Sequence, residues 1–464
     1  MYTLTRSCAL LLGALAMPAV HADALDEHQG NWLGAFSVPN GPTIKIGASL
    51  FARADGTPWA SVAVPDQHAY DIPVKAIRRN GATLTLDIPG ATIKLKWDQD
   101  HFSGQFQETG GAPFALQLQR VDQLPIKLRP QTPQAPFPYK DETLAIPGAD
   151  GVVLGATLSL PNGIKHPPLV VLVHGSGPAN RDESGAGHQP FAVLADYLAR
   201  QGIAVLRYDK RGIGRSSGDY EQHTAVQLSA DLHAVLKHLR AGRQFSRIGV
   251  LGHSEGPGLA AAVAARDPQA LDFLVSLGGV GLNGLDMMLL QDQATAISNG
   301  ASQAQSATIV AYARRYYQVI IDQAEVAPRL AALAALDGQR ASAEKAMAHG
   351  FQMDQGSLSA QWADKPFLRA QLMSDTPRDW RAVRCPVLAL NGSIDRQVPL
   401  ASLDGIGAAL KAGGNTRVDM EVMPSLNHMF QSAKTGNEDE YDKIEETIAP
   451  LALQRITAFV ASLH

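Results

Sequence analysis

A pentapeptide near the middle of the chain constrains its fold more than any other feature. It has the sequence GHSEG at residues 252–256, and it lies between an apolar, strand-like run at 247–251 and a helix-like run of small residues at 257–265. A strand-to-helix turn of this kind exposes the serine hydroxyl, and glycine fits the crowded positions two residues on either side. The context predicts that Ser254 is a nucleophile, although such a short motif also arises by chance around an ordinary surface serine.

The length and composition are those of a globular protein with room for two or three domains. The chain has 464 residues, of which 45% are hydrophobic and 18% are charged, and both fractions are ordinary. Its 40 basic and 44 acidic residues give a formal net charge of −4. This balance does not indicate a nucleic-acid partner, because nucleic-acid-binding domains carry a strongly basic surface.

Residues 1–22 have the pattern of a secretory signal peptide. Arg6 precedes an apolar run at residues 8–20, and small residues end the segment at Ala22. The apolar run is shorter than the roughly 20 residues that a membrane-spanning helix needs. We therefore expect cleavage after Ala22, export to the periplasm or the medium, and no integral membrane segment in the mature chain. Cys385 would then be its only cysteine, so we expect no intramolecular disulfide and interpret Cys385 as a buried structural residue.

The segment from residue 25 to residue 123 is predicted to be an antiparallel β domain, barrel-like or a half-barrel. Alternating apolar and polar residues at 43–51, 83–88 and 92–97 are separated by turn sequences such as Asn-Gly and Pro-Gly. Four aromatic residues are expected to fill its core, in preference to lining a ligand cavity: Trp32, Trp59, Trp97 and Phe102.

A proline-rich linker and then an α/β domain are predicted for the rest of the chain. Five prolines between residues 125 and 138 indicate an extended linker over 124–139. Over 140–464, apolar strands alternate with helical patterns, which is typical of a doubly wound, mostly parallel sheet. A helical stretch rich in Ala and Gln interrupts the alternation at about 284–370. We predict that it is a cap over the C-terminal ends of the strands, where open α/β sheets bind ligands.

Two further residues complete the chemistry that a serine nucleophile needs. A base must take the hydroxyl proton, and an acid must hold that base in the correct tautomer. Asp395 follows one predicted strand of the C-terminal region, and His428 follows the next. Ser254, Asp395 and His428 thus occur in the order nucleophile, acid, base. We predict these three roles for them, with Asp404 in the following helix as the alternative acid.

A tetrahedral intermediate also needs two backbone N–H donors directed at its oxyanion. We expect one from Glu255, directly after the nucleophile, and one from Ser176 in the glycine-rich run at 174–178. A second glycine-rich run at 208–216 lacks the ending of a phosphate-binding loop, so we interpret it as a turn held by Asp209 and arginines. No pair of cysteines or histidines has metal-ligand spacing, and we expect neither a metal nor a cofactor.

Taken together, these segments resemble the α/β-hydrolase superfamily, and within it the exported bacterial serine hydrolases that are esterase-like. The matching segments cover roughly residues 140–464: HGSGP at 174–178, RDE at 181–183, YDKRGIGRS at 208–216, GHSEG at 252–256, NGSID at 391–395 and LNHMF at 426–430. The resemblance implies hydrolysis of carboxylic esters through an acyl-enzyme, with Ser254, Asp395 and His428 as the triad. The chain departs from many relatives in carrying NGS at 391–393, where they carry Gly-Asp.

Three functions are compatible with this sequence, in decreasing order of expectation. The first is a carboxylesterase whose partner is a small-molecule ester with a small or medium acyl chain. The second is a peptidase or another acyl hydrolase on the same triad, because a fold does not fix the substrate. The third is a non-catalytic protein whose β domain binds an apolar or glycan ligand. In either enzyme, the cap at 284–370 is expected to decide what enters the pocket.

Overall fold

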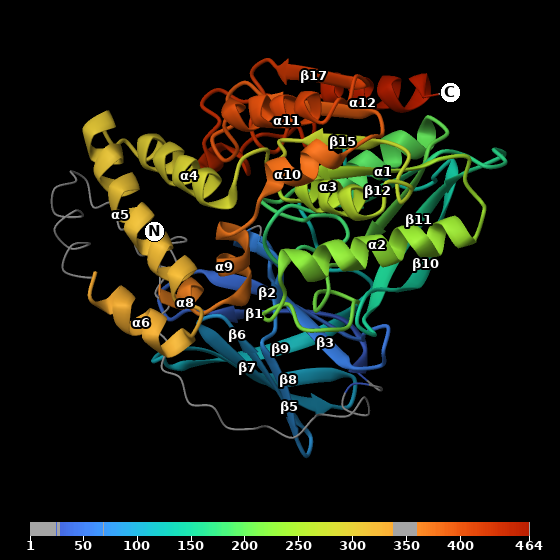
Figure 1. Cartoon of the computed structure of the whole chain (residues 1–464). Coiled ribbons are helices and arrows are strands. Elements are labelled where there is room, and N and C mark those ends of the chain that lie inside the picture. Colours follow the sequence, from blue (N-terminus) through green and yellow to red (C-terminus); the bar gives the residue numbers. More distant parts are fainter. Residues whose placement is uncertain (1–24, 26–27, 68, 337–359, 464) are drawn as a thin grey trace.

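The chain folds around two separate β-sheets, seen as blue and as green to red arrows in Figure 1. This computed structural model describes residues 25, 28–67, 69–336 and 360–463. The expected signal peptide at 1–22 lies outside these residues, as do the part of the cap at 337–359 and the C-terminal residue. Over the described ranges, no helix has the length and hydropathy needed to cross a membrane.

The first sheet is antiparallel and curled. Within the described residues it has nine strands in the order β4-β3-β2-β1-β9-β8-β7-β6-β5. They are β1 (Gly30–Ser37), β2 (Thr43–Ala52), β3 (Pro58–Val64), β4 (Ala69–Pro73), β5 (Ala76–Asn80), β6 (Thr83–Ile88), β7 (Ala91–Asp98), β8 (His101–Glu108) and β9 (Pro113–Val121). β3, next to one end of the sheet, contacts β5 at the other end, so the two ends approach each other. This is the curled antiparallel domain that the alternating runs predicted.

Aromatic side chains fill the inside of this curled sheet. Trp32 and Phe102 are buried in this core, and Trp97 packs partly buried against it. The rings of Trp32 and Phe102 meet edge to face with their centroids 4.7 Å apart, a favoured geometry for aromatic pairs. The prediction is confirmed for Trp32, Trp97 and Phe102. Trp59 is buried but lies outside this core: it precedes the inward-facing Ala60 in β3, so it points to the other face of the sheet, where it stacks on Phe51.

The second sheet is mixed and is parallel from β13 to β17. The described residues give it eight strands in the order β10-β11-β13-β12-β14-β15-β16-β17, in which β11 is antiparallel to both of its neighbours, β10 and β13. They are β10 (Tyr139–Pro147), β11 (Val153–Pro161), β12 (Leu169–Val173), β13 (Ala204–Tyr208), β14 (Ile248–His253), β15 (Leu274–Leu277), β16 (Val387–Gly392) and β17 (Val418–Met423). All residues of β12 and β14 are buried, as expected for strands covered on both faces.

Helices cover both faces of this sheet. Side chains of α1 (Pro190–Arg200) and α12 (Pro450–Ser462) form the core on one face. The core on the other face includes side chains of α2 (Ala225–Ala241), α3 (Gly256–Arg266), α10 (Thr376–Ala382) and α11 (Leu400–Ala412). The expected doubly wound α/β-hydrolase architecture is therefore the observed one.

A helical insertion separates β15 from β16. Its described helices are α4 (Gly284–Ser298), α5 (Gln303–Asp322), α6 (Val326–Ala334), α8 (Ala360–Ala363) and α9 (Pro366–Leu372). They have a core of their own that buries Tyr312, Tyr316 and Tyr317. Figure 1 shows these helices, in yellow and orange, at one side of the molecule. The helical insertion follows the expectation from the sequence, and the close tyrosines are its packing residues.

Cys385 lies directly before β16 and is buried. Its burial raises the pKa of the thiol to about 12, so the reactive thiolate is scarce at neutral pH. The interpretation of Cys385 as a buried structural residue is confirmed.

The β domain packs on a loop that follows β13. Arg53 donates from its guanidinium to the main-chain oxygen of Gly212 over 3.2 Å, and the Ala54 N–H donates to the oxygen of Arg215 over 2.9 Å. The guanidinium of Arg215 in turn lies over the ring of Phe51, 5.1 Å from its centroid. The same loop helps to build the candidate site described next.

Candidate active site

Ser254 lies on a sharp turn between β14 and α3. Its φ angle is +57°, in the left-handed region that non-glycine residues seldom adopt. The Ser254 N–H donates to the oxygen of Leu277 over 2.9 Å, which fixes the turn to β15. The side chain is partly exposed, whereas its neighbours in β14 are buried. The strained strand-to-helix turn expected from the sequence is present.

The glycines of the pentapeptide occupy positions without room for a side chain. A Cβ at Gly256 would lie 2.2 Å from the oxygen of Val173, and one at Gly252 would lie 2.4 Å from the nitrogen of Pro257. Both contacts are to backbone atoms, which cannot move without displacing β12 or α3. Packing around the turn therefore requires glycine at both positions.

This crowding predicts a stability difference between two glycines of one helix. We expect Gly256→Ala to lower the free energy of unfolding by about 1–3 kcal/mol, because the methyl group overpacks the turn. Gly258 is the matched control, since a Cβ there would meet only the Thr376 methyl carbon at 3.5 Å. Gly258→Ala should raise the free energy of unfolding by about 0.4–1 kcal/mol. Urea denaturation of both variants measures the difference, and equal stabilities would contradict the packing argument.

Asp395 and His428 meet at the C-terminal ends of β16 and β17. The Nδ1 of His428 lies 2.8 Å from Oδ2 of Asp395, and the two side chains are 4% and 0% exposed. The other carboxylate oxygen of Asp395 accepts the N–H groups of Gln397 at 2.9 Å and Val398 at 2.8 Å. The carboxylate is thus held in one orientation. Because Nδ1 faces an acceptor, we assign its proton there, which leaves Nε2 as the basic nitrogen.

The structure also brings this pair beside the turn of Ser254 and separates the alternative acid from it. Gly278 directly follows Leu277, and a Cβ there would lie 3.2 Å from Oδ2 of Asp395 and 3.3 Å from Nδ1 of His428. Asp404 instead lies exposed on α11. Of the two aspartates considered from the sequence, Asp395 is the one that contacts the histidine.

The two expected oxyanion donors belong to segments that adjoin the nucleophile. Ser176 is exposed in the loop after β12, and Glu255 lies at the N-terminus of α3, where the helix dipole favours an anion. In the part of the chain that the structure describes, neither N–H donates to a protein acceptor. A Cβ at Gly175 would lie 2.9 Å from the Cβ of Ser254, so the loop approaches the nucleophile closely. Both N–H groups are therefore available to a ligand.

Lys210 fixes the loop that carries Ser176. Its Nζ donates to the oxygens of Gly175 at 2.5 Å and Gly177 at 3.0 Å, and it lies 3.5 Å from a carboxylate oxygen of Glu255. The lysine side chain is 3% exposed. Because it binds the carbonyl groups on both sides of Ser176, it limits how that peptide can rotate. Nothing in the local sequence around Lys210 indicates this role.

The turn at 208–216 is held as the sequence predicted. The carboxylate of Asp209 accepts the backbone N–H groups of Arg181 at 2.7 Å and Arg215 at 2.9 Å. It also accepts two hydrogen bonds from the Arg181 guanidinium. This turn places Lys210 under the loop of Ser176.

A second acid and histidine lie beside the turn. One carboxylate oxygen of Glu183 accepts the Gly175 N–H at 2.6 Å and lies 3.1 Å from Nδ1 of His253. The Nε2 of His253 lies 3.0 Å from the main-chain oxygen of His428. Sequence reasoning missed both residues. The RDE segment at 181–183 contains Glu183, but nothing local indicates that it reaches a residue 70 positions later.

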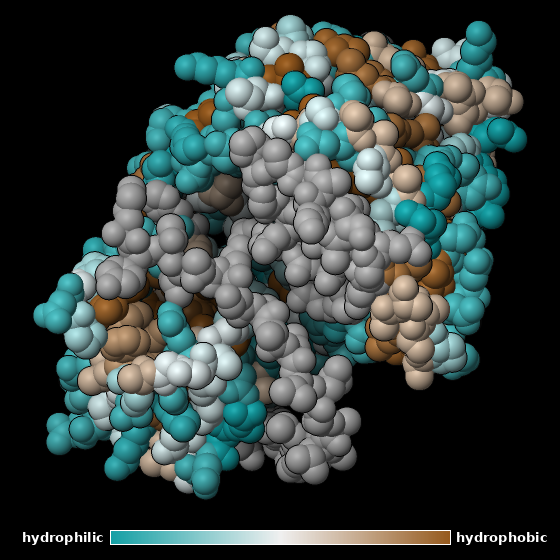
Figure 2. Space-filling view, turned by 90° about the vertical axis from the view of Figure 1, so that its left-hand side faces the viewer, coloured by the Kyte–Doolittle hydropathy of each residue, from teal (hydrophilic) through white to brown (hydrophobic). Residues whose placement is uncertain are grey.

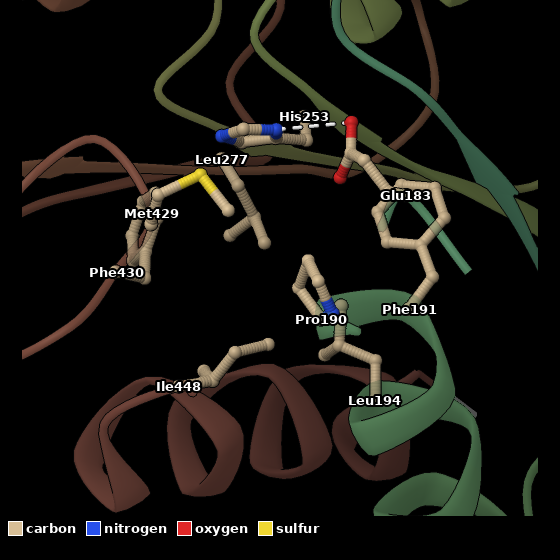
Figure 3. A pocket seen from close by; sticks show the side chains of 9 residues that line it. All are labelled: Glu183, Pro190, Phe191, Leu194, His253, Leu277, Met429, Phe430 and Ile448. Carbon is tan, nitrogen blue, oxygen red and sulfur yellow. Dashed lines mark hydrogen bonds and ion pairs between the residues drawn. The ribbon is translucent and has the colours of Figure 1, made fainter. Parts of the chain in front are cut away.

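These two side chains face a small apolar cavity (Figure 3). Figure 3 shows Glu183 and His253 on one side, with α1 on the opposite side. The apolar lining residues are Pro190, Phe191, Leu194, Leu277, Met429, Phe430 and Ile448. Most of them also belong to the core between the sheet and α1 with α12. The cavity therefore lies within the protein core, against the segments that carry Ser254 and His428.

Figure 2 views the molecule from the side of Figure 1 on which the cap helices lie. On this face hydrophobic residues, in brown, occur among hydrophilic residues, in teal. The cap contacts the loop before α2, where Lys365 pairs with Glu221 over 2.8 Å. The ring of Phe367 stacks on His223 with centroids 5.4 Å apart. The cap thus contacts the α/β domain through both charged and aromatic groups.

Known proteins resemble this chain over the α/β domain. A sequence model of the family described as "Serine aminopeptidase, S33" matches residues 165–432. The esterase EstD of Thermotoga maritima is 32% identical over 131 residues, which are 28% of this chain and 31% of the esterase. RutD of Escherichia coli, named as a carbamate hydrolase, is 30% identical over 247 residues, which are 52% of this chain and 78% of that protein.

The solved structures that resemble this chain include Est1E from Butyrivibrio proteoclasticus with ferulic acid bound. It is 16% identical, with a TM-score of 0.42, and the match covers 68% of this chain and 98% of Est1E. The family match, by contrast, spans more than half of the 464 residues and includes the turn of Ser254, Asp395 and His428. The protein therefore belongs to the S33 serine aminopeptidase family and is an α/β hydrolase.

Proposed function

We propose that this hydrolase cleaves carboxylic esters with small or medium acyl chains through an acyl-enzyme. Ser254 is the proposed nucleophile, His428 the general base and Asp395 the acid that orients it. The N–H groups of Ser176 and Glu255 form the proposed oxyanion hole. In this scheme His428 takes the Ser254 proton during attack and returns it to the leaving alcohol, and water repeats the cycle on the acyl-enzyme.

The observation that carries this proposal is the buried contact between His428 and Asp395 beside the turn of Ser254. A histidine that donates from Nδ1 to a buried carboxylate has its Nε2 lone pair free to accept a proton. The same carboxylate stabilises the imidazolium that forms during attack. The distance of 2.8 Å between the two side chains, both of which are buried from water, supports this role.

A peptidase on the same triad is the alternative, and the family description favours it. An aminopeptidase, however, must bind the charged amine of its substrate, which calls for an anionic side chain without another partner. The glutamates beside the nucleophile are already engaged, Glu183 by His253 and Glu255 by Lys210. This engagement, together with the relatives named as esterase and carbamate hydrolase, supports esters over peptides.

The proposal predicts labelling by a fluorophosphonate and a preference for esters. The wild-type protein should be labelled at Ser254, as read by mass spectrometry of the modified peptide. With p-nitrophenyl esters and p-nitroanilides of the same acyl group, kcat/KM should be higher for the ester, and the series from C2 to C12 should peak at a short or medium chain. Faster cleavage of the anilide would favour the peptidase. Without labelling or turnover, a non-catalytic binding protein would become the better explanation.

A further inference from the structure

The acid and histidine that face the core cavity connect two parts of the site. Glu183 holds the N–H of Gly175, one residue before the proposed oxyanion donor Ser176. His253 contacts the main-chain oxygen of His428, the proposed base. Since Glu183 and His253 also contact each other, a continuous set of hydrogen bonds runs from the oxyanion loop to the histidine loop. It passes beneath the turn that carries Ser254.

The acceptors around His253 determine its protonation state. Its Nδ1 faces a carboxylate oxygen, and its Nε2 faces a carbonyl oxygen. The carbonyl oxygen cannot donate a hydrogen bond, nor can the ionised carboxylate of Glu183, whose pKa is lowered because the charge and hydrogen bond of His253 outweigh its burial. A neutral imidazole carries only one N–H. Both contacts are therefore made only when His253 is an imidazolium. Its charge is balanced by the carboxylate of Glu183.

The surroundings make this charged pair sensitive to the loss of either partner. The side chains of His253 and Glu183 are 11% and 12% exposed. On the side that faces the cavity, the pair is surrounded by apolar side chains such as Leu277 and Phe191 (Figure 3). A charge left here without its partner would be poorly solvated. If either residue is replaced by a neutral one, we therefore expect the remaining member of the pair to become neutral as well. The hydrogen bonds that require its charged form should then break.

We propose that Glu183 and His253 are positioning residues, forming a carboxylate–imidazolium pair that aligns the oxyanion loop with the loop of the general base. This inference rests on the proposed function, because it assigns the pair a part in the alignment for ester attack. Neither side chain needs to touch the substrate. The pair acts through the Gly175 N–H and the His428 carbonyl, whose positions set those of Ser176 and the base.

The pair also gives the site a dependence on pH. Burial alone lowers the pKa of an imidazole, but the charge and hydrogen bond of Glu183 outweigh it and raise the pKa of His253 to about 8. The pKa of Glu183 is lowered, since the charge and hydrogen bond of His253 outweigh its burial. The other titratable groups around the pair are Asp395, His174 and His428. Burial lowers the pKa of His174 to about 4, so that imidazole stays neutral over the working range.

The test is the pH profile of Glu183→Gln and His253→Gln, measured with a p-nitrophenyl ester. At pH 7 each variant should lose about 10²-fold in kcat with little change in KM, the size expected for misalignment of a catalytic site. Wild-type kcat should fall above pH 8, because at pH 9.5 only about 3% of a group with a pKa of 8 is protonated. The variants have no imidazolium to lose in this range. The ratio of wild-type to variant kcat should therefore shrink by about tenfold or more between pH 7 and pH 9.5.

Asp267→Asn is the matched control. It removes the carboxylate of another acid–histidine pair, in which Asp267 lies 2.9 Å from His233 on the outer side of the α/β domain, with both side chains partly exposed. Its kcat and pH profile should match the wild type. A loss in Glu183→Gln that is constant across pH, or wild-type kinetics in both variants, would overturn the proposal.

A second measurement does not depend on activity. In ¹⁵N-histidine-labelled protein, the imidazole nitrogens of His253 should titrate near pH 8, and in Glu183→Gln they should titrate below pH 6.5. A neutral His253 at pH 7 in the wild type would overturn the pair, even if a variant fails to fold. Failure of the proposed function is recognised separately, by the absence of fluorophosphonate labelling in the wild type.

Discussion

Replacing Ser254 by alanine should lower kcat for ester hydrolysis by about 10⁶-fold, the loss typical of removing a serine nucleophile. The alanine retains the Cβ, and the Ser254 N–H that donates to Leu277 is unchanged. The turn should therefore persist while the acyl-enzyme can no longer form. Stopped-flow measurement with a p-nitrophenyl ester should show no burst of p-nitrophenol, and fluorophosphonate labelling should disappear.

Ser425→Ala is a suitable control for this variant. Ser425 also has a φ angle of +57° and is exposed, so the substitution makes the same change on the same backbone conformation. Its activity and labelling should remain close to those of the wild type. Residual activity in Ser254→Ala above about 1% of wild type would contradict the nucleophile assignment, given the loss expected.

Asp395→Asn should lower kcat by about 10⁴-fold at neutral pH. An asparagine fits the same space and can still accept the N–H groups of Gln397 and Val398, which now bind Oδ1. Its amide nitrogen would then face Nδ1 of His428 and donate to it. The histidine would be forced into the tautomer with its proton on Nε2, where it cannot accept the Ser254 proton. Steady-state kinetics with the same ester measures this loss.

Asp404→Asn provides the matched comparison, because Asp404 is exposed on α11 and was the alternative acid. It should leave kcat within about twofold, as surface substitutions usually do. Combining Asp395→Asn with Ser254→Ala should cost no more than Ser254→Ala alone, since members of a triad act as a unit. A large loss in Asp404→Asn with a small one in Asp395→Asn would reverse the assignment of the acid.

Much of the architecture could be predicted because it follows from patterns among residues that are close in the sequence. Alternating residues predicted the curled sheet, and apolar strands separated by helical segments predicted the doubly wound sheet. The order of Ser254, Asp395 and His428 along the chain predicted that each lies in a loop after a strand. That Asp395 and not Asp404 contacts the histidine followed from its place directly after β16. Their catalytic roles remain predictions, and the experiments above test them.

The parts of the site that were missed are those built by contacts between distant segments. Lys210 looked like one residue of a basic turn, yet in the fold its ammonium group lies buried under the loop of Ser176. Arg53 lies far from this turn in the sequence, yet its guanidinium donates to the oxygen of Gly212, within the turn that includes Lys210. The sequence pattern around a charged residue does not show whether its side chain will be exposed to solvent or will pair with another group in the interior. Their partners are set by how the strands and loops pack.

The pentapeptide at 252–256 illustrates the division between sequence and structure. By itself the sequence determined a strained turn with a partly exposed serine, because the flanking glycines and the strand-to-helix context are properties of neighbouring residues. Only the tertiary structure decided what His253 does, although it precedes the serine directly. Its two ring nitrogens meet Glu183, 70 positions earlier, and the main chain of His428, 175 positions later. The physical reason is that a hydrogen bond depends on distance in space, and the packing of two loops against β14 sets that distance.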